Sequence, residues 1–131
     1  MCQRVCAVMI GAALNCVFTA SADSVAAKLP PPAERPVAFA TDIQPLFERS
    51  CLRCHGAERP KGRYRLDNRA SALQGGSHGP AISPGDSARS ALIVYVARLD
   101  PEMAMPPEGK GTPLTREDVA LLRAWIDQGA K

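Results

Sequence analysis

The chain has 131 residues, a length that suits one small domain. It carries 16 Lys and Arg against 13 Asp and Glu, and the resulting net charge of +3 is too balanced to indicate a nucleic-acid-binding protein. Only 5% of the residues are aromatic, so a domain of this size has few large apolar side chains to bury. We therefore expect something other than side chains to help fill the core.

The first element in chain order is an apolar run over residues 5–20, which follows Arg4. The small residues at positions 20–22 have the spacing that signal peptidase accepts, so we interpret residues 1–22 as a signal peptide. A membrane anchor is the alternative, but the run is shorter than the about 20 apolar residues of a spanning helix, and Asn15 interrupts it. We expect an exported, periplasmic protein with no membrane span after cleavage.

The mature chain is expected to begin with a linker and to contain a single pair of cysteines, Cys51 and Cys54. Residues 23–38 are rich in proline and small residues, a composition typical of an extended tether. The folded domain is therefore predicted over residues 39–131. Because an exported protein meets an oxidising compartment, where unused thiols are a liability, the cysteine pair is expected to have a defined use.

A helix is predicted from about residue 42 to residue 52. Thr41 and Gln44 have the spacing of a capping box, and Pro45 lies early enough in the helix to be tolerated. Apolar side chains recur on one face of this helix and lead the chain directly into Cys51.

The last predicted helix spans about residues 116–128. Thr115 is its expected cap and Gly129 its expected stop, and apolar side chains recur at helical spacing at Val119, Leu122, Trp125 and Ile126. The segment after Asp86 also fits a helix, but its β-branched residues suit a strand equally well, so periodicity leaves it open. No long alternating strand pattern is present and the connecting loops are rich in Gly and Pro, which predicts an all-α domain.

Cys51, Cys54 and His55 form a Cys-x-x-Cys-His motif. A structural zinc site needs four ligands and would have to recruit His78, and the adjacent Cys54 and His55 would reach one ion together with difficulty. A redox dithiol belongs near a βαβ pattern, which this sequence lacks. The motif is typical of covalent haem c attachment, in which both thiols form thioethers with the porphyrin and the histidine becomes an axial ligand of iron. We expect one haem c.

The second axial ligand has three candidates, Met103, Met105 and His78. A methionine thioether favours reduced iron, as in His/Met cytochromes. Met105 is preferred because the two prolines that follow it would stiffen the loop around its sulfur. Met103 could instead fill the core, and His78 could be an exposed loop residue.

Three stretches carry a resemblance to a known family. They are FATDIQPLFERSCLRCHG, then GRYRLDNRASALQGGSHGPAISPGD with its Gly-Gly and Gly-Pro loop, and MPPEGKGTPLTREDVALLRAWIDQGA with its Met-Pro-Pro loop and Leu-x-x-Trp-Ile helix. They resemble the planctomycete-type cytochrome c domain, a branch of the class I cytochrome c superfamily, over about residues 39–130. The resemblance implies a small all-α haem fold in which the first and last helices cross, with a middle helix after residue 86.

The resemblance also implies roles for single residues. His55 would be the proximal iron ligand and Met105 the distal one. The carbonyl of Pro80 would accept the hydrogen bond from the His55 ring, which places His78 on the proximal side. Members of this family are usually a small part of much larger exported proteins, and because this chain ends at Lys131 it resembles a free-standing version.

An iron atom with two protein ligands has no open position for a substrate, so we expect an electron carrier and not an enzyme, either alone or as a cytochrome subunit of a larger oxidoreductase. A haem-based sensor with a labile sixth ligand is the alternative. Seven basic residues lie between positions 49 and 69 against two acidic ones. They predict either a solvated face or a docking surface for an acidic redox partner.

Overall fold

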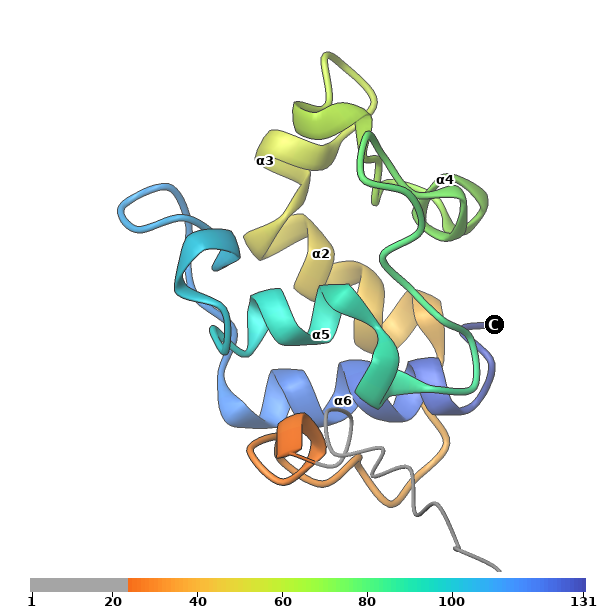
Figure 1. Ribbon diagram of the computed structural model, residues 1–131. Coiled ribbons are helices and arrows are strands. Elements are labelled where there is room, and N and C mark those ends of the chain that lie inside the picture. The colour runs from red at the N-terminus through yellow and green to blue at the C-terminus, as the bar shows by residue number, and fades with distance from the viewer. Residues whose placement is uncertain (1–23) are drawn as a thin grey trace, which may run out of the picture.

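The computed structural model describes residues 24–131, and the predicted signal peptide lies outside these residues. Residues 24–131 form helices joined by loops and contain no β-strand, only an isolated bridge between Gly76 and Gly79 (Figure 1). In chain order the elements are the π-helical turn η1 (Phe39–Ile43), α2 (Gln44–Ser50), α3 (Leu52–His55), η2 (Lys61–Arg63), α4 (Arg69–Gln74), η3 (Ser87–Arg89), α5 (Ala91–Val96), η4 (Pro101–Met103) and α6 (Arg116–Asp127). The predicted all-α class is confirmed. None of the helices in this part of the chain has the length and apolar character that crossing a membrane requires.

The first helical segment differs from its prediction at the N-terminus. It begins with η1 before α2, and Thr41 and Gln44 do not form a capping box, because the N-cap of α2 is Ile43 and makes no side-chain hydrogen bond. The carboxylate of Asp42 instead accepts the backbone N–H of Ala38 at 2.9 Å. The predicted cap was therefore wrong, since the helical path already starts one turn earlier.

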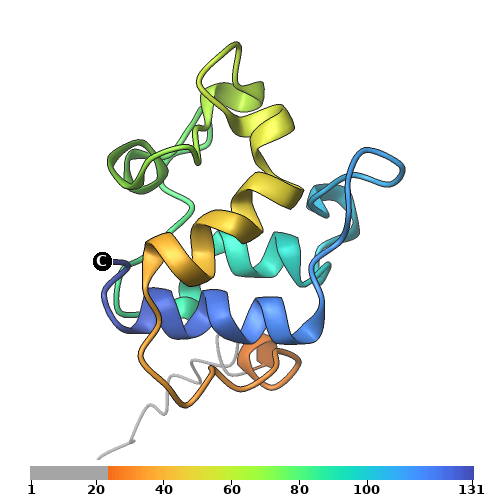
Figure 2. The same ribbon diagram turned by 180° about the vertical axis from the view of Figure 1, so that it is seen from behind.

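The first and last helices cross, as the resemblance implied. Figure 2 shows η1 and α2 lying obliquely above α6. The two segments meet through three aromatic rings: the Trp125 ring centroid lies 5.7 Å from that of Phe39 and 6.2 Å from that of Phe47. Phe47 and Trp125 are each 1% exposed. The hydrophobic core is fully shielded from solvent at this crossing.

The terminal helix α6 agrees with its prediction. The Thr115 hydroxyl accepts the backbone N–H of Asp118 at 3.1 Å, and the Asp118 carboxylate accepts the backbone N–H of Thr115 at 2.9 Å, so the two residues form a capping box. The helix ends one residue before the predicted boundary, and Gly129 follows with φ of +96°.

The segment that periodicity left open is helical. Asp86 caps η3 through the backbone N–H of Arg89, and α5 follows. Leu92, Ile93 and Val96 are buried along α5. Its β-branched residues therefore serve a buried helix face, where packing against the core outweighs their weak preference for strands.

The proline-rich segment packs against α6. Leu29 and Val37 are buried, the backbone N–H of Val37 donates to the Gln128 side chain at 3.0 Å, and the buried Arg123 guanidinium donates to the Pro30 carbonyl. The interpretation of residues 23–38 as a free tether is therefore corrected for this segment. Its few apolar side chains and its carbonyl groups are enough to attach an extended chain to a helix.

Candidate cofactor site

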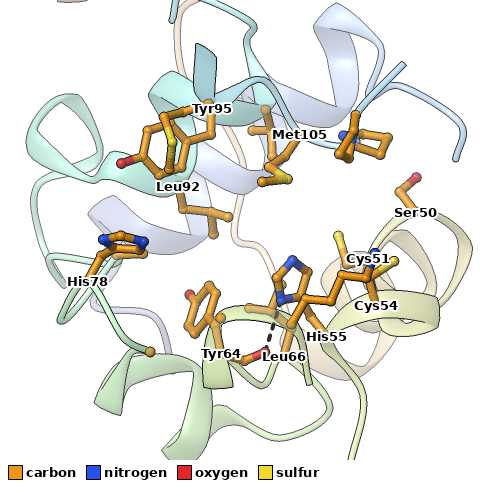
Figure 3. Close-up of a pocket in the computed structure, with 18 of the residues that line it drawn as sticks. Ser50, Cys51, Cys54, His55, Tyr64, Leu66, His78, Leu92, Tyr95 and Met105 are labelled. Atoms are coloured by element: carbon orange, nitrogen blue, oxygen red, sulfur yellow. Dashed lines mark hydrogen bonds between the residues drawn. The ribbon is translucent and has the colours of Figure 1, made fainter. Parts of the chain in front are cut away.

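The Cys-x-x-Cys-His motif lines a large pocket on the side of the fold away from α6. Its walls come from the end of α2, from α3 and the segment after it, from the loop around His78, from α5 and from the loop after η4 (Figure 3). Its volume is about 1220 Å³, including the part open to solvent. The walls are largely apolar, through Leu66, Ala81, Leu92, Val96 and Pro106. A pocket with such walls fits a mainly apolar group.

The imidazole of His55 is oriented by a backbone carbonyl. Its Nδ1 lies 3.0 Å from the carbonyl oxygen of Tyr64, and a carbonyl can only accept, so Nδ1 carries the proton. Nε2 is then the unprotonated nitrogen, and in Figure 3 this edge of the ring points across the pocket toward Met105. The His55 ring is therefore in the tautomer and the orientation that a metal ligand requires.

The carbonyl that holds His55 differs from the one that the resemblance implied. The ring bonds to Tyr64, and Pro80 is exposed and is not among the residues that line the pocket. His78 and Gly79, which precede Pro80, do reach the pocket. The role assigned to Pro80 is therefore corrected in this structure: the same kind of bond is made, but by the chain nine residues after His55.

The two thiols come from a single turn of chain. The backbone N–H groups of Cys54 and His55 both donate to the Cys51 carbonyl, at 3.0 and 2.9 Å, which places the three side chains around one helical turn. Both cysteines are half-buried free thiols at one end of the pocket (Figure 3). Burial raises the pKa of the Cys51 thiol to about 12, although the charge of Arg49 opposes the shift. The Cys51 side chain is therefore a neutral thiol at neutral pH.

The sulfur of Met105 projects into the pocket from the wall opposite His55 (Figure 3). Its loop is tied to neighbouring structure, because the backbone N–H of Met105 donates to the Tyr95 carbonyl at 3.0 Å and the Arg98 guanidinium donates to the Pro106 carbonyl at 3.0 Å. Met103 also lines the pocket, from η4, and His78 reaches its rim as an exposed residue. The structure thus brings all three candidate ligands to the same pocket.

A buried hydroxyl supports the fit of a bound group. Ser50 lines the pocket at the end of α2, and its Oγ is buried and has no hydrogen-bond partner within residues 24–131. Buried polar atoms nearly always find a partner, so an unpaired one in the wall of a cavity marks a place where a bound group would contact the protein. In the same part of the chain, no three His, Cys, Asp or Glu side chains gather as ligands of a bare metal ion.

Two residues of the site, Tyr64 and Tyr95, were not predicted from the sequence. Tyr64 acts through its backbone carbonyl, and its ring packs edge-on against His55 with centroids 5.7 Å apart. Its hydroxyl donates to the Ala72 carbonyl at 3.2 Å, and burial raises the pKa of the phenol. A backbone carbonyl has no residue-type signature, so no sequence signal could have identified it.

Five of the seven basic residues between positions 49 and 69 fall into two groups. Arg49 pairs with Asp118 and Arg65 pairs with Asp67, each at 2.6 Å, and Arg69 donates to a backbone carbonyl. The side chains of Arg53 and Lys61 line the pocket mouth together with Lys110 and form no hydrogen bond or ion pair within residues 24–131; no Asp or Glu lines this pocket. The mouth of the pocket therefore has a positive rim.

The segment that contains the Cys-x-x-Cys-His motif and Met105 matches a known protein family. The family model described as Planctomycete cytochrome C matches residues 51–109, from the first cysteine of the motif to the loop after Met105. Comparisons with curated proteins and with solved structures found no match. The resemblance inferred from the sequence is thereby confirmed for this segment.

Proposed function

We propose that the chain is an electron carrier that holds one haem c, because residues 51–109 match the family model described as Planctomycete cytochrome C. Each of the two thiols, Cys51 and Cys54, would add its S–H bond across one vinyl group of the porphyrin, with no atom lost. His55 and Met105 would be the two axial ligands. When bound, the haem supplies reversible one-electron exchange between ferrous and ferric iron.

One observation carries this proposal: His55 and Met105 face each other across an apolar pocket that has both thiols at one end. The His55 ring is held by Tyr64 with Nε2 available, and the backbone of the Met105 loop is held by α5. A thioether ligand and a largely apolar pocket both favour the reduced, less charged iron. The protein's own contribution is therefore to fix the two ligands and to exclude water from the ring.

We assign the distal position to Met105 in preference to Met103. The backbone of Met105 is bonded to α5, and the next residue, Pro106, is buried and bonded through its carbonyl to Arg98. Such a loop can hold a sulfur atom in place without further ordering when iron binds. If His55 and Met105 both bound the iron, it would have no open position for a substrate, which favours a carrier over a catalyst or a gas sensor.

The test is a set of absorption spectra from the protein isolated after export, with matched variants Met105→Ala and Met103→Ala. We expect a pigment that acidified acetone does not extract and, in the ferric wild type, the weak red band of methionine–iron coordination. Met105→Ala should lose this band and bind carbon monoxide rapidly when reduced, and Met103→Ala should do neither. Loss of the band in Met103→Ala alone would transfer the assignment to Met103, and rapid stoichiometric carbon monoxide binding by the wild type would favour a sensor.

We further propose that the positive rim docks an acidic redox partner in the periplasm. Arg53, Lys61 and Lys110 are exposed cations around the pocket mouth, where electron transfer over the shortest distance would occur. A positively charged rim attracts an acidic surface over several ångströms, and this attraction weakens as rising salt concentration screens the charges. Reduction by an acidic partner should therefore slow as ionic strength rises, and should slow at low salt in Lys61→Gln/Lys110→Gln but not in the control Lys28→Gln, which lies in the N-terminal segment. Rates that do not depend on salt would exclude this docking surface.

A further inference from the structure

The loop of residues 75–79, which we call the glycine loop, packs directly on the residue that orients His55. The backbone N–H of Ser77 donates to the Gly62 carbonyl at 2.7 Å, and the Arg63 guanidinium donates to the Ser77 hydroxyl at 3.2 Å. The glycine loop is therefore joined at two points to the two residues immediately before Tyr64.

The contact requires a glycine at position 76. A Cβ atom there would lie 2.5 Å from the Gly62 carbonyl oxygen and 2.7 Å from the Cβ of Tyr64, distances that such atoms essentially never show. Two of the opposing atoms belong to backbone or to the root of a side chain, so they cannot move aside without shifting residues 62–64. The missing side chain at Gly76 thus allows the close approach that sets the position of Tyr64.

Tyr64 is held from two further directions. Its hydroxyl donates to the carbonyl of Ala72, within α4, at 3.2 Å. Two residues later the backbone N–H of Leu66 donates to the His55 carbonyl at 2.8 Å, so residues 64–66 bond both to the ring and to the backbone of His55. Before Tyr64, Gly62 and Arg63 both have left-handed backbone conformations, with φ of 61° and 53°. A left-handed arginine is strained, and strain of this kind persists only where surrounding contacts enforce it.

We propose that Tyr64 is a positioning residue for the iron ligand. The contacts of the glycine loop with residues 62–64 hold the Tyr64 carbonyl at hydrogen-bond distance from His55 Nδ1, and this hydrogen bond sets the reduction potential of the haem. This inference rests on the proposed function, because it requires iron on His55. A carbonyl that accepts the Nδ1–H makes the imidazole a more basic ligand, and a more basic ligand stabilises ferric iron more than ferrous iron. Weakening the bond should therefore raise the potential.

The experiment measures the reduction potential of the haem-loaded protein and of three variants. Gly76→Ala should displace Tyr64 and change the ferric-to-ferrous equilibrium by roughly tenfold toward the reduced form, which is about 59 mV for one electron. Tyr64→Phe removes only the bond to Ala72 and should raise the potential by less.

The matched control is Gly85→Ala. Gly85 has φ of +87° and open space around the position of a Cβ, and its backbone N–H donates to the Ile126 carbonyl, on the other side of the fold. Alanine there is strained and should lower the free energy of unfolding without contacting Tyr64. The control should therefore lose stability and keep the wild-type potential. Equal potentials in Gly76→Ala and Gly85→Ala would overturn the proposal.

A second measurement tests the role of Tyr64 even if Gly76→Ala does not fold. In the reduced wild-type protein, NMR should detect a slowly exchanging ring proton on His55 that is close to Tyr64, and labelled tyrosine is easily assigned because the chain has only two. A ring proton that exchanges freely, or one close to Pro80 instead, would refute the role of Tyr64. A protein that carries no covalent pigment would instead defeat the proposed function itself, so the two failures are distinguishable.

Discussion

The two sides of the molecule are stabilised by different kinds of contact. Around α6 the core is closed by large side chains such as Phe47, Leu122 and Trp125, which are at most 1% exposed. Between residues 51 and 81, by contrast, the buried apolar side chains are only Leu66 and Ala72, and the segments are joined mainly by backbone hydrogen bonds.

This difference indicates where the stability of each side originates. Burial of apolar surface is the dominant favourable contribution to folding, and backbone hydrogen bonds add comparatively little net free energy because they replace bonds to water. We infer that the α6 side can fold on its own side chains, whereas the pocket side depends on the apolar surface of the group that it binds.

The largest effect is expected from removing both thiols. Cys51→Ser/Cys54→Ser should carry no covalent haem, and the backbone amides of residues 55–79 should lose most of their protection from hydrogen exchange while the amides of α6 keep theirs. Hydrogen-exchange mass spectrometry of the two regions is the measurement. The control variant Lys28→Gln, in the N-terminal segment, keeps both thiols and should retain the pigment. Equal loss of protection on both sides would show that the molecule is a single cooperative unit.

The second effect concerns the α6 side alone. Trp125 is packed against Phe39 and Phe47 at the helix crossing, so Trp125→Ala should lower the free energy of unfolding by about 3–5 kcal/mol. Chemical denaturation of the haem-loaded protein measures this. Leu121→Ala, at a half-buried position on the same helix, is the control and should cost less. If Trp125→Ala lowered the free energy of unfolding by less than the control does, the helix crossing would not be the main source of stability on the α6 side.

The smallest effect is expected at the surface where η1 begins. The Arg35 guanidinium donates to the Asp42 carboxylate at 2.7 Å and, together with the N–H of Ala38, lowers the pKa of that carboxyl to about 2. Because the folded pKa lies below the unfolded value of about 4, the contribution of this carboxylate is complete above pH 4 and disappears as the pH falls through about 2. The Arg35 side chain of this ion pair is exposed, so the effect on stability is small.

An NMR titration of the Ala38 amide would measure this contact. The amide signal should move with a midpoint of about 2 in the wild type and should not titrate in Asp42→Asn. A midpoint near 4 for the wild-type Ala38 signal would mean that Arg35 does not hold the carboxylate in solution.

The parts of the fold that sequence patterns predicted are those governed by local interactions. The cap at Thr115 and the periodic apolar positions of α6 depend on residues within a few positions of one another. The helix α4 escaped prediction although Asn68 caps it, because it spans only six residues and has one buried side chain, Ala72. The contact of the proline-rich segment with α6 was also missed, since it joins residues about 90 positions apart along the chain.

The sequence by itself determined the chemistry of the site: two thiols and an imidazole within five residues, a set of candidate sulfur ligands, and the helices that present them. Only the tertiary structure decided which atoms meet. In the structure the Met105 side chain lies across the pocket from His55, and the carbonyl that orients the His55 ring belongs to Tyr64 and not to Pro80. The structure also distinguishes the arginines that form ion pairs from the cations that line the pocket mouth. The physical reason is that ligand type is a property of single side chains, whereas a hydrogen bond to a backbone carbonyl or a charge at a rim depends on segments that only folding brings together.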